Sequence, residues 1–138
     1  MDDDADDRHI LSDIFEELNY PNEIITFDNG ASAYRYLIQE GVHPFIILSD
    51  VNMPGLNGIE LRRMMVADET YRHKCIPFLL ITTSSNKESQ ESAFELSVTG
   101  YFVKPQTYAG LKSIIKVIVA YWQVCYSPHD TEPAIANQ

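Results

Sequence analysis

The sequence is short of basic residues and of cysteine. It carries 10 lysines and arginines against 20 aspartates and glutamates, which gives a formal net charge of −10 at pH 7. A protein that binds nucleic acid needs a basic face to meet the phosphates, so this charge argues against direct nucleic-acid binding. The two cysteines, Cys75 and Cys125, lie far apart and lack metal-ligand spacing. We expect both to be reduced and to lie in or near the core.

Long hydrophobic runs are absent as well. No apolar stretch approaches the roughly 20 residues that a helix needs to span a bilayer, and the acidic N-terminal run is the opposite of a signal peptide. These features predict a cytoplasmic protein that does not bind a membrane. With 138 residues the chain has the size of one domain, and it is long enough to bury a core without disulfides.

The strongest pattern in the chain lies at residues 45–58. An apolar run, residues 45–48, is followed by Ser49, Asp50 and a loop that contains Pro54 and two glycines. Such a run predicts a strand that is buried on both faces and ends at Asp50. In open α/β sheets, ligands collect beyond the carboxyl ends of the strands, so Asp50 is a candidate functional residue. The alternative is that Asp50 is a solvated side chain that caps the end of the strand and has no functional role.

The rest of the chain divides into alternating helices and strands. Alternation of this kind predicts right-handed crossovers and a doubly wound parallel α/β sheet with helices on both faces. The predicted strands cover residues 23–27, 45–50, 76–83 and 100–103. The predicted helices cover residues 10–18, 33–38, 59–65, 87–96 and about 107–126, with a polar connection at 68–74 and a disordered tail at 127–138. We therefore expect one domain over residues 1–126.

Three of these strands end in polar residues. Asp50, Thr82 and Lys104 meet at one edge of the predicted sheet, and the acidic residues before the first helix can reach the same edge. Crowded carboxylates repel one another, and a hard divalent cation with oxygen ligands relieves that repulsion, so Mg²⁺ is the expected ion. A lysine and a hydroxyl beside such an ion are suited to bind phosphoryl oxygens.

These residues are part of a wider motif set. Its members are Asp2, Asp3, the segment Asp50-Val51-Asn52-Met53-Pro54, Gly58, Thr82, Tyr101 and Lys104-Pro105. In this order and spacing the set resembles that of the receiver domain of two-component response regulators, in particular stand-alone receivers of the chemotaxis-regulator type. The resemblance covers nearly the whole chain, from Asp2 to the last helix. It implies a flavodoxin-like (βα)5 receiver fold.

The resemblance also implies a phosphoacceptor and a metal site. Asp50 would be the nucleophile that accepts a phosphoryl group from a phosphohistidine on a sensor histidine kinase. The metal ligands would be Asp2, Asp3, Asp50 and the backbone carbonyl of Asn52, with Mg²⁺ as the cofactor. Asp3 would bind the ion directly, and Asp2 would bind it directly or through water.

Three further residues would respond to the phosphoryl group. Lys104 would pair with it and Thr82 would donate a hydrogen bond to it. Tyr101 would be an aromatic switch that moves inward as Thr82 turns, so that the surface of the last two helices and the last strand changes. The alternatives are a half-buried strand aromatic at Tyr101 and a surface lysine at Lys104.

The function implied is that of a single-domain response regulator or phosphorelay shuttle. It would be phosphorylated and dephosphorylated by its own chemistry and would otherwise not be an enzyme. Its partner would be a sensor histidine kinase or a phosphotransfer protein. An alternative is an interaction module that keeps the fold and works without phosphorylation. A phosphatase with an aspartyl nucleophile usually has a second acid two residues later, and Asn52 stands there, so we set that class aside.

The last predicted helix carries two apolar stripes. The core stripe consists of Leu111, Ile114, Ile115, Ile118, Trp122 and Cys125. Val117, Tyr121 and Val124 form an adjoining stripe at helical spacing. Exposed apolar patches mark interaction sites, so we expect a homodimer or target surface on this helix and the last strand. The alternative is that both stripes pack on the sheet.

One departure from the family pattern concerns the first strand. The family has a short apolar strand before the acidic pair, and here Met1 stands directly before Asp2. We therefore expect the first strand to be missing or truncated, which leaves exposed ladder edges on the strands at 23–27 and 45–50. The sheet would be completed by a longer native chain or by another chain.

Overall fold

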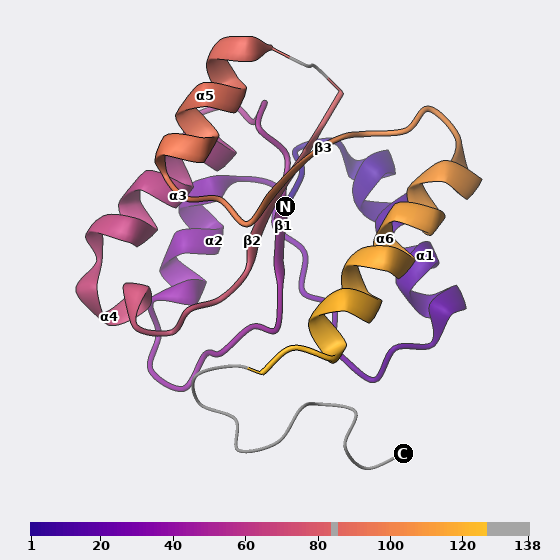
Figure 1. The fold of residues 1–138 in the computed structure, drawn as a ribbon, viewed down its shortest axis with the longest axis horizontal. Helices are drawn as coiled ribbons and strands as arrows, with labels where there is room; N and C mark the ends of the chain where they lie inside the picture. The colour runs from indigo at the N-terminus through magenta and orange to yellow at the C-terminus, as the bar shows by residue number, and fades with distance from the viewer. Residues whose placement is uncertain (84–85, 127–138) are drawn as a thin grey trace.

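Three parallel strands form the centre of the computed structural model, which describes residues 1–83 and 86–126 (Figure 1). The strands are β1 (Ile47–Ser49), β2 (Phe78–Thr82) and β3 (Gly100–Val103), in the order β1-β2-β3. Ser49 pairs with Leu80 and Leu80 pairs with Tyr101, so the carboxyl ends of the strands meet at one edge. The predicted parallel α/β sheet is confirmed. The tail predicted at 127–138 lies outside the described residues.

Helices connect the strands and cover both faces of the sheet. They are α1 (Ala5–Leu18), α2 (Gly30–Leu37), α3 (Gly58–Ala67), α4 (Glu69–Arg72), α5 (Lys87–Glu95) and α6 (Tyr108–Gln123). In Figure 1, α1 and α6 lie on one side of the sheet, and α2, α3, α4 and α5 lie on the other. Helix α4 forms within the segment that the sequence predicted as a connection, and α6 ends at Gln123 rather than at residue 126.

Side-chain caps fix where the longer helices begin. The capping residues are Asp4, Asn29, Asn57, Asn86 and Thr107, and each accepts a hydrogen bond from a backbone N–H of the first turn. The cap of α3 is reciprocal, because the Glu60 carboxylate also accepts a hydrogen bond from the Asn57 N–H at 3.0 Å. This pair of hydrogen bonds anchors the end of the loop that starts at Asp50.

Strand β2 is buried along its whole length. Phe78 and Leu80 pack in a cluster with residues of α2, α3, α4 and α5, whereas Ile81 packs with Ile14 of α1 and Ile115 of α6. Alternate side chains of β2 thus point to opposite faces of the sheet. Both faces are covered by apolar side chains, as a parallel sheet with crossover helices requires.

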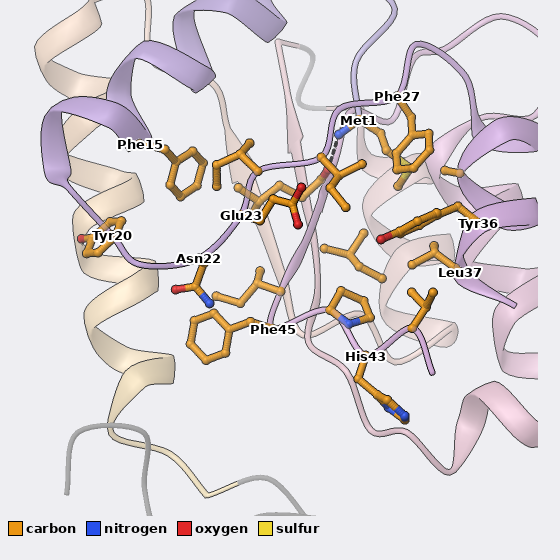
Figure 2. A pocket seen from close by; sticks show the side chains of 18 of the residues that line it. Met1, Phe15, Tyr20, Asn22, Glu23, Phe27, Tyr36, Leu37, His43 and Phe45 are labelled. Atoms are coloured by element: carbon orange, nitrogen blue, oxygen red, sulfur yellow. Dashed lines mark hydrogen bonds between the residues drawn. The ribbon is translucent and has the colours of Figure 1, made fainter. Parts of the chain in front are cut away.

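The strand predicted at residues 23–27 does not form, so this prediction was wrong. One ladder contact exists at its end, where the Asp2 N–H donates to the Phe27 carbonyl at 3.1 Å. Ile24 and Ile25 are 41% and 44% exposed. A strand needs a partner along its length, and among the described residues the backbone partner of this segment is Asp2, at the end where Met1 and Phe27 lie close together in Figure 2. Within the described residues, β1 is therefore the first strand in chain order.

Two side chains of low polarity lie at the surface. Ile38 is 45% exposed, because α2 ends at Leu37 and Ile38 follows as its C-cap. Cys75 is exposed and has a φ of 52°, in the turn before β2, so it is not a core residue. Cys125 is partly buried, and both cysteines are free thiols. Within the described ranges, none of the helices has the length and apolar character to cross a membrane.

Candidate functional site

Strand β1 carries Asp50 to the edge where the strands end. The loop turns at once, since the Asn52 N–H donates to an Asp50 carboxylate oxygen at 3.0 Å. Gly58 approaches the strand end so closely that a Cβ there would collide with the Asp50 carbonyl oxygen and the Ser49 hydroxyl. Burial raises the pKa of the Asp50 carboxyl, and the negative charge of Asp2 raises it further. The hydrogen bond from the Asn52 N–H lowers the pKa but does not cancel the rise.

Asp2 and Asp3 approach Asp50 from the N-terminal segment. One carboxylate oxygen from each of the three residues lies within 4.8 Å of the other two. Asp2 is buried, Asp50 is half-buried and Asp3 is exposed, so the cluster opens to water on one side. Met1 holds the segment in place, because its ammonium donates to the Leu48 carbonyl at 2.5 Å and its carbonyl accepts from the Asp50 N–H at 2.9 Å. The structure thus brings the predicted carboxylates together.

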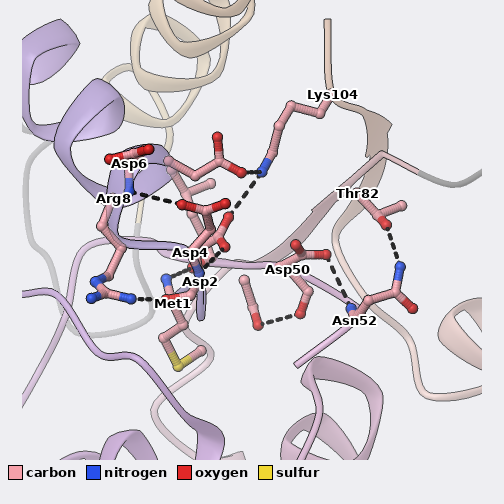
Figure 3. Close-up of polar contacts among 12 residues, drawn as sticks. Met1, Asp2, Asp4, Asp6, Arg8, Asp50, Asn52, Thr82 and Lys104 are labelled. Atoms are coloured by element: carbon pink, nitrogen blue, oxygen red, sulfur yellow. Dashed lines mark hydrogen bonds and ion pairs between the residues drawn. The ribbon is translucent and has the colours of Figure 1, made fainter. Parts of the chain in front are cut away.

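Lys104 follows β3 and reaches the same cluster (Figure 3). Its ammonium lies 2.8 Å from an Asp2 carboxylate oxygen and 2.7 Å from an Asp7 carboxylate oxygen, and its side chain is 8% exposed. Burial alone would lower the pKa of Lys104, but the hydrogen bonds and charges of Asp2 and Asp7 outweigh burial and raise it. Within the described part of the chain, the ion pairs of Lys104 go to Asp2 and Asp7 and not to Asp50.

Asp7 is the site residue that the sequence did not single out. It lies in the first turn of α1, whose start is set by the Asp4 cap, and from there its carboxylate turns toward Lys104. Four other aspartates precede it, so composition alone does not distinguish it. The feature of the sequence that could have identified Asp7 was its position in the first turn of the helix that follows the acidic pair.

Thr82 ends β2 and is fully buried. Its hydroxyl oxygen accepts a hydrogen bond from the Asn52 side-chain amide at 3.2 Å, which Figure 3 also draws. The Thr82 carbonyl accepts from the Lys104 N–H at 2.7 Å, and this bond fixes where the lysine leaves the sheet. The Asn52 side chain therefore bridges the loop after β1 to the end of β2. The sequence predicted a metal-binding role for the backbone carbonyl of Asn52 and did not predict this hydrogen bond of its side chain.

Tyr101 lies on β3 in register with Leu80 and packs partly buried against the α2, α3, α4 and α5 side of the core. Burial raises the pKa of the Tyr101 phenol, and the negative charge of Asp50 raises it further. The Tyr101 phenol thus lies close enough to Asp50 for the charge of that carboxylate to affect it. A switch role for Tyr101 stays a prediction.

Known proteins resemble this chain in sequence and in fold. The sequence profile described as the response regulator receiver domain matches residues 1–116. Chemotaxis protein CheY-3 of Vibrio cholerae is 35% identical over 112 residues, which are 81% of this chain and 82% of that protein. The phosphorylated cyanobacterial phytochrome response regulator RcpA matches with a TM-score of 0.83 and 26% identity, over 93% of this chain and 94% of that one.

A receiver domain from Pseudomonas aeruginosa has the same fold. It belongs to a sensor histidine kinase, and its structure has a magnesium ion coordinated in the active site cleft. It matches with a TM-score of 0.68 and 22% identity, over 87% of this chain and 93% of that chain.

Proposed function

The chain belongs to the response regulator receiver family, and we propose that it acts as a phosphoacceptor whose Asp50 takes a phosphoryl group from a phosphohistidine. The observation that carries this proposal is the meeting of Asp50, two further carboxylates and Lys104 at one sheet edge. One Asp50 carboxylate oxygen attacks phosphorus, the P–N bond breaks, and its electron pair stays on the imidazole nitrogen. The product is an acyl phosphate on Asp50. The partner is a sensor histidine kinase or a phosphotransfer protein.

The acidic cluster fits a hard divalent cation. Carboxylate oxygens are the donor type that Mg²⁺ prefers, and one from each of three residues lies within 4.8 Å of the other two. Asp2, Asp3 and Asp50 would hold the ion, with the backbone carbonyl of Asn52. When bound, Mg²⁺ would neutralise the carboxylates and bind a phosphoryl oxygen. The Asp2 carboxylate already accepts hydrogen bonds from Lys104 and from the Asp4 N–H. It would bind the metal ion directly or through a water molecule.

The polar residues around Asp50 would rearrange when it carries a phosphoryl group. The Thr82 hydroxyl oxygen accepts a hydrogen bond from the Asn52 side chain. Because a hydroxyl can accept and donate at once, Thr82 would donate a hydrogen bond to a phosphoryl oxygen. Lys104 would shift its ammonium from Asp7 toward the new charge. Tyr101 would follow Thr82 inward, which biases the packing of α5, β3 and α6.

The surface proposed to read this change is apolar. Val117 and Tyr121 on α6 and its C-cap residue Val124 are 69%, 60% and 60% exposed, so the second stripe does not pack on the sheet. We propose it as the homodimer or target surface. Val117→Glu with Tyr121→Glu should weaken self-association or target binding, and Ser113→Glu on the same helix should not. Unchanged assembly and target binding in both phosphorylation states would end this idea.

In this role the chain is a switch and does no chemistry on molecules other than its phosphodonor. Its own residues form and hydrolyse the acyl phosphate. We place the functional domain at residues 1–126, which includes the matched residues 1–116 and all of α6. We place its action in the cytoplasm beside its kinase.

The test is incubation with Mg²⁺ and acetyl phosphate, read by intact mass. The protein should gain about 80 Da, the mass of one phosphoryl group, and lose the gain in Asp50→Asn or with EDTA. Asp28→Asn, at an exposed aspartate outside the cluster, is the matched control and should be phosphorylated normally. A folded protein that gains no mass would instead support an interaction module that works without phosphorylation.

A further inference from the structure

The Lys104 ammonium has two carboxylate partners that differ in their contact with water. It lies 2.8 Å from an Asp2 oxygen, as Figure 3 shows, and 2.7 Å from an Asp7 oxygen. The Asp2 side chain is 3% exposed, whereas the Asp7 side chain is 33% exposed. A buried carboxylate that loses its cation stays uncompensated, but a carboxylate in contact with water is rehydrated. Asp7 is therefore the partner that Lys104 can leave at the smaller cost in free energy.

The two carboxylates also differ in their other contacts. Asp2 accepts a second hydrogen bond from the Asp4 N–H at 3.0 Å, and it is one of the three acids whose oxygens cluster with those of Asp3 and Asp50. Asp7 is not one of these three acids. A divalent cation held by the cluster would compensate the charge of Asp2 and leave Asp7 with its own charge. Asp7 would then be the stronger of the two attractions on Lys104.

Lys104 is near Asp50 but is paired with other residues. The positive charge of Lys104 lowers the pKa of the Asp50 carboxyl, so the two groups interact across the site. Among the described residues, the ammonium donates its hydrogen bonds to Asp2 and Asp7. An ammonium has three protons to donate, and two of them are directed at these carboxylates. The attraction of Asp7 therefore opposes any movement of the ammonium toward Asp50.

We propose that Asp7 is a positioning residue that holds Lys104 back from Asp50 and so limits the rate at which Asp50 is phosphorylated. This role rests on the proposed function, because it concerns the same lysine and the same phosphoryl group. Asp7 acts through Lys104 and takes no part in the transfer itself. The incoming phosphoryl group competes with Asp7 for the ammonium, and the Asp7 carboxylate is left to water when the phosphoryl group wins.

The first test measures the rate of phosphorylation by acetyl phosphate at saturating Mg²⁺, read by intact mass. Asp7→Asn removes the charge that holds Lys104 and keeps the size of the side chain, so the rate should rise about threefold. Asp7→Glu keeps the charge and should leave the rate close to that of the wild type. Asp6→Asn removes the same charge from the neighbouring exposed aspartate, and it should leave the rate unchanged.

The outcomes separate this role of Asp7 from the proposed function. A folded wild-type chain that gains no phosphoryl group would contradict both. Normal phosphorylation of the wild type with equal rates in Asp7→Asn and Asp6→Asn would overturn only the restraint by Asp7. A slower rate in Asp7→Asn would overturn it as well, because Asp7 would then help to place Lys104 for the reaction.

A second measurement follows the Lys104 ammonium in the absence of metal and phosphodonor. In protein labelled with ¹⁵N at lysine, NMR can measure how fast the ammonium protons exchange with water. Exchange at Lys104 should be slow in the wild type, because its side chain is 8% exposed and two carboxylates accept its protons. It should be several-fold faster in Asp7→Asn, while exchange at Lys112, which pairs with Glu17, should not change. Unchanged exchange at Lys104 would show that Asp7 does not hold the ammonium, and the proposal would be wrong.

Discussion

The Lys104 ammonium lies 2.8 Å from the Asp2 carboxylate, and this contact joins the end of β3 to the N-terminal segment across 102 positions of sequence. Both side chains are nearly removed from water, with exposures of 8% and 3%. Lys104 therefore compensates a buried carboxylate in the structure described here, and would meet a phosphoryl group only by changing partners.

Removal of the Lys104 charge should destabilise the fold. Lys104→Met keeps the length of the side chain but leaves Asp2 as a buried and uncompensated charge, so the free energy of unfolding should fall by about 3 kcal/mol. Urea unfolding measures the loss. Lys112→Met removes a lysine from the more exposed pair with Glu17 and should cost less than about 1 kcal/mol. Similar costs for the two variants would mean that the Lys104 contact is not a buried ion pair in solution.

Magnesium should stabilise the protein through the exposed acid of the cluster. Mg²⁺ that binds only the folded chain raises the unfolding midpoint with concentration. Asp3→Asn should weaken this binding by about tenfold, or 1.4 kcal/mol, while leaving the metal-free stability unchanged, since Asp3 is exposed. Thermal unfolding across a Mg²⁺ titration measures both effects. Asp28→Asn is the control, and a loss of Mg²⁺ response there would indicate general screening rather than a site.

The Met1 amine should make stability depend on pH. Its pKa falls from 8.0 to about 6 on folding, so between these values the unfolded chain binds more protons than the folded one. The free energy of unfolding should therefore be highest above pH 8 and fall by about 2 kcal/mol as the pH drops to 6. A chain acetylated at Met1 should lack this part of the slope. The same slope in both chains would assign the pH dependence to other groups.

Gly58 should be required for the position of Asp50. Gly58→Ala places a Cβ against the Asp50 carbonyl oxygen and the Ser49 hydroxyl, and backbone atoms there cannot move aside without displacing the strand end. Overpacking of this kind should cost about 2 kcal/mol and slow phosphorylation from acetyl phosphate. Gly41→Ala meets open space at a positive φ, so it should cost stability by strain alone and leave the phosphorylation rate unchanged. A normal rate in Gly58→Ala would argue against this close contact.

Several features of the site were predictable because they depend on short stretches of sequence. The apolar run before Asp50 forms a strand wherever its two faces are covered, and polar residues after β2 and β3 fall at the same edge because parallel strands end together. Asp50, Thr82 and Lys104 were placed at that edge for this reason, whereas the acidic pair was assigned to it through the family resemblance. Exposure of Val117 and Tyr121 also agrees with the helical period of α6.

Other features were decided by partners that are distant in sequence. Residues 23–27 have a strand-like pattern, yet a strand forms only when a neighbour supplies backbone hydrogen bonds along it. Asp2 supplies one such bond, to Phe27 at the end of the segment. The hydrogen bond from Asn52 to Thr82 joins the loop after β1 to the end of β2, and no local pattern specifies the distance between them.

Local sequence patterns were enough to predict the three strands that form and the polar groups at their ends, because apolar periodicity and strand polarity are properties of short segments. The pairing of Lys104 with Asp2 and Asp7 and the exposure of Ile24 and Ile25 were visible only in the folded structure. These outcomes depend on distances between segments far apart in the chain, which are set when the layers pack.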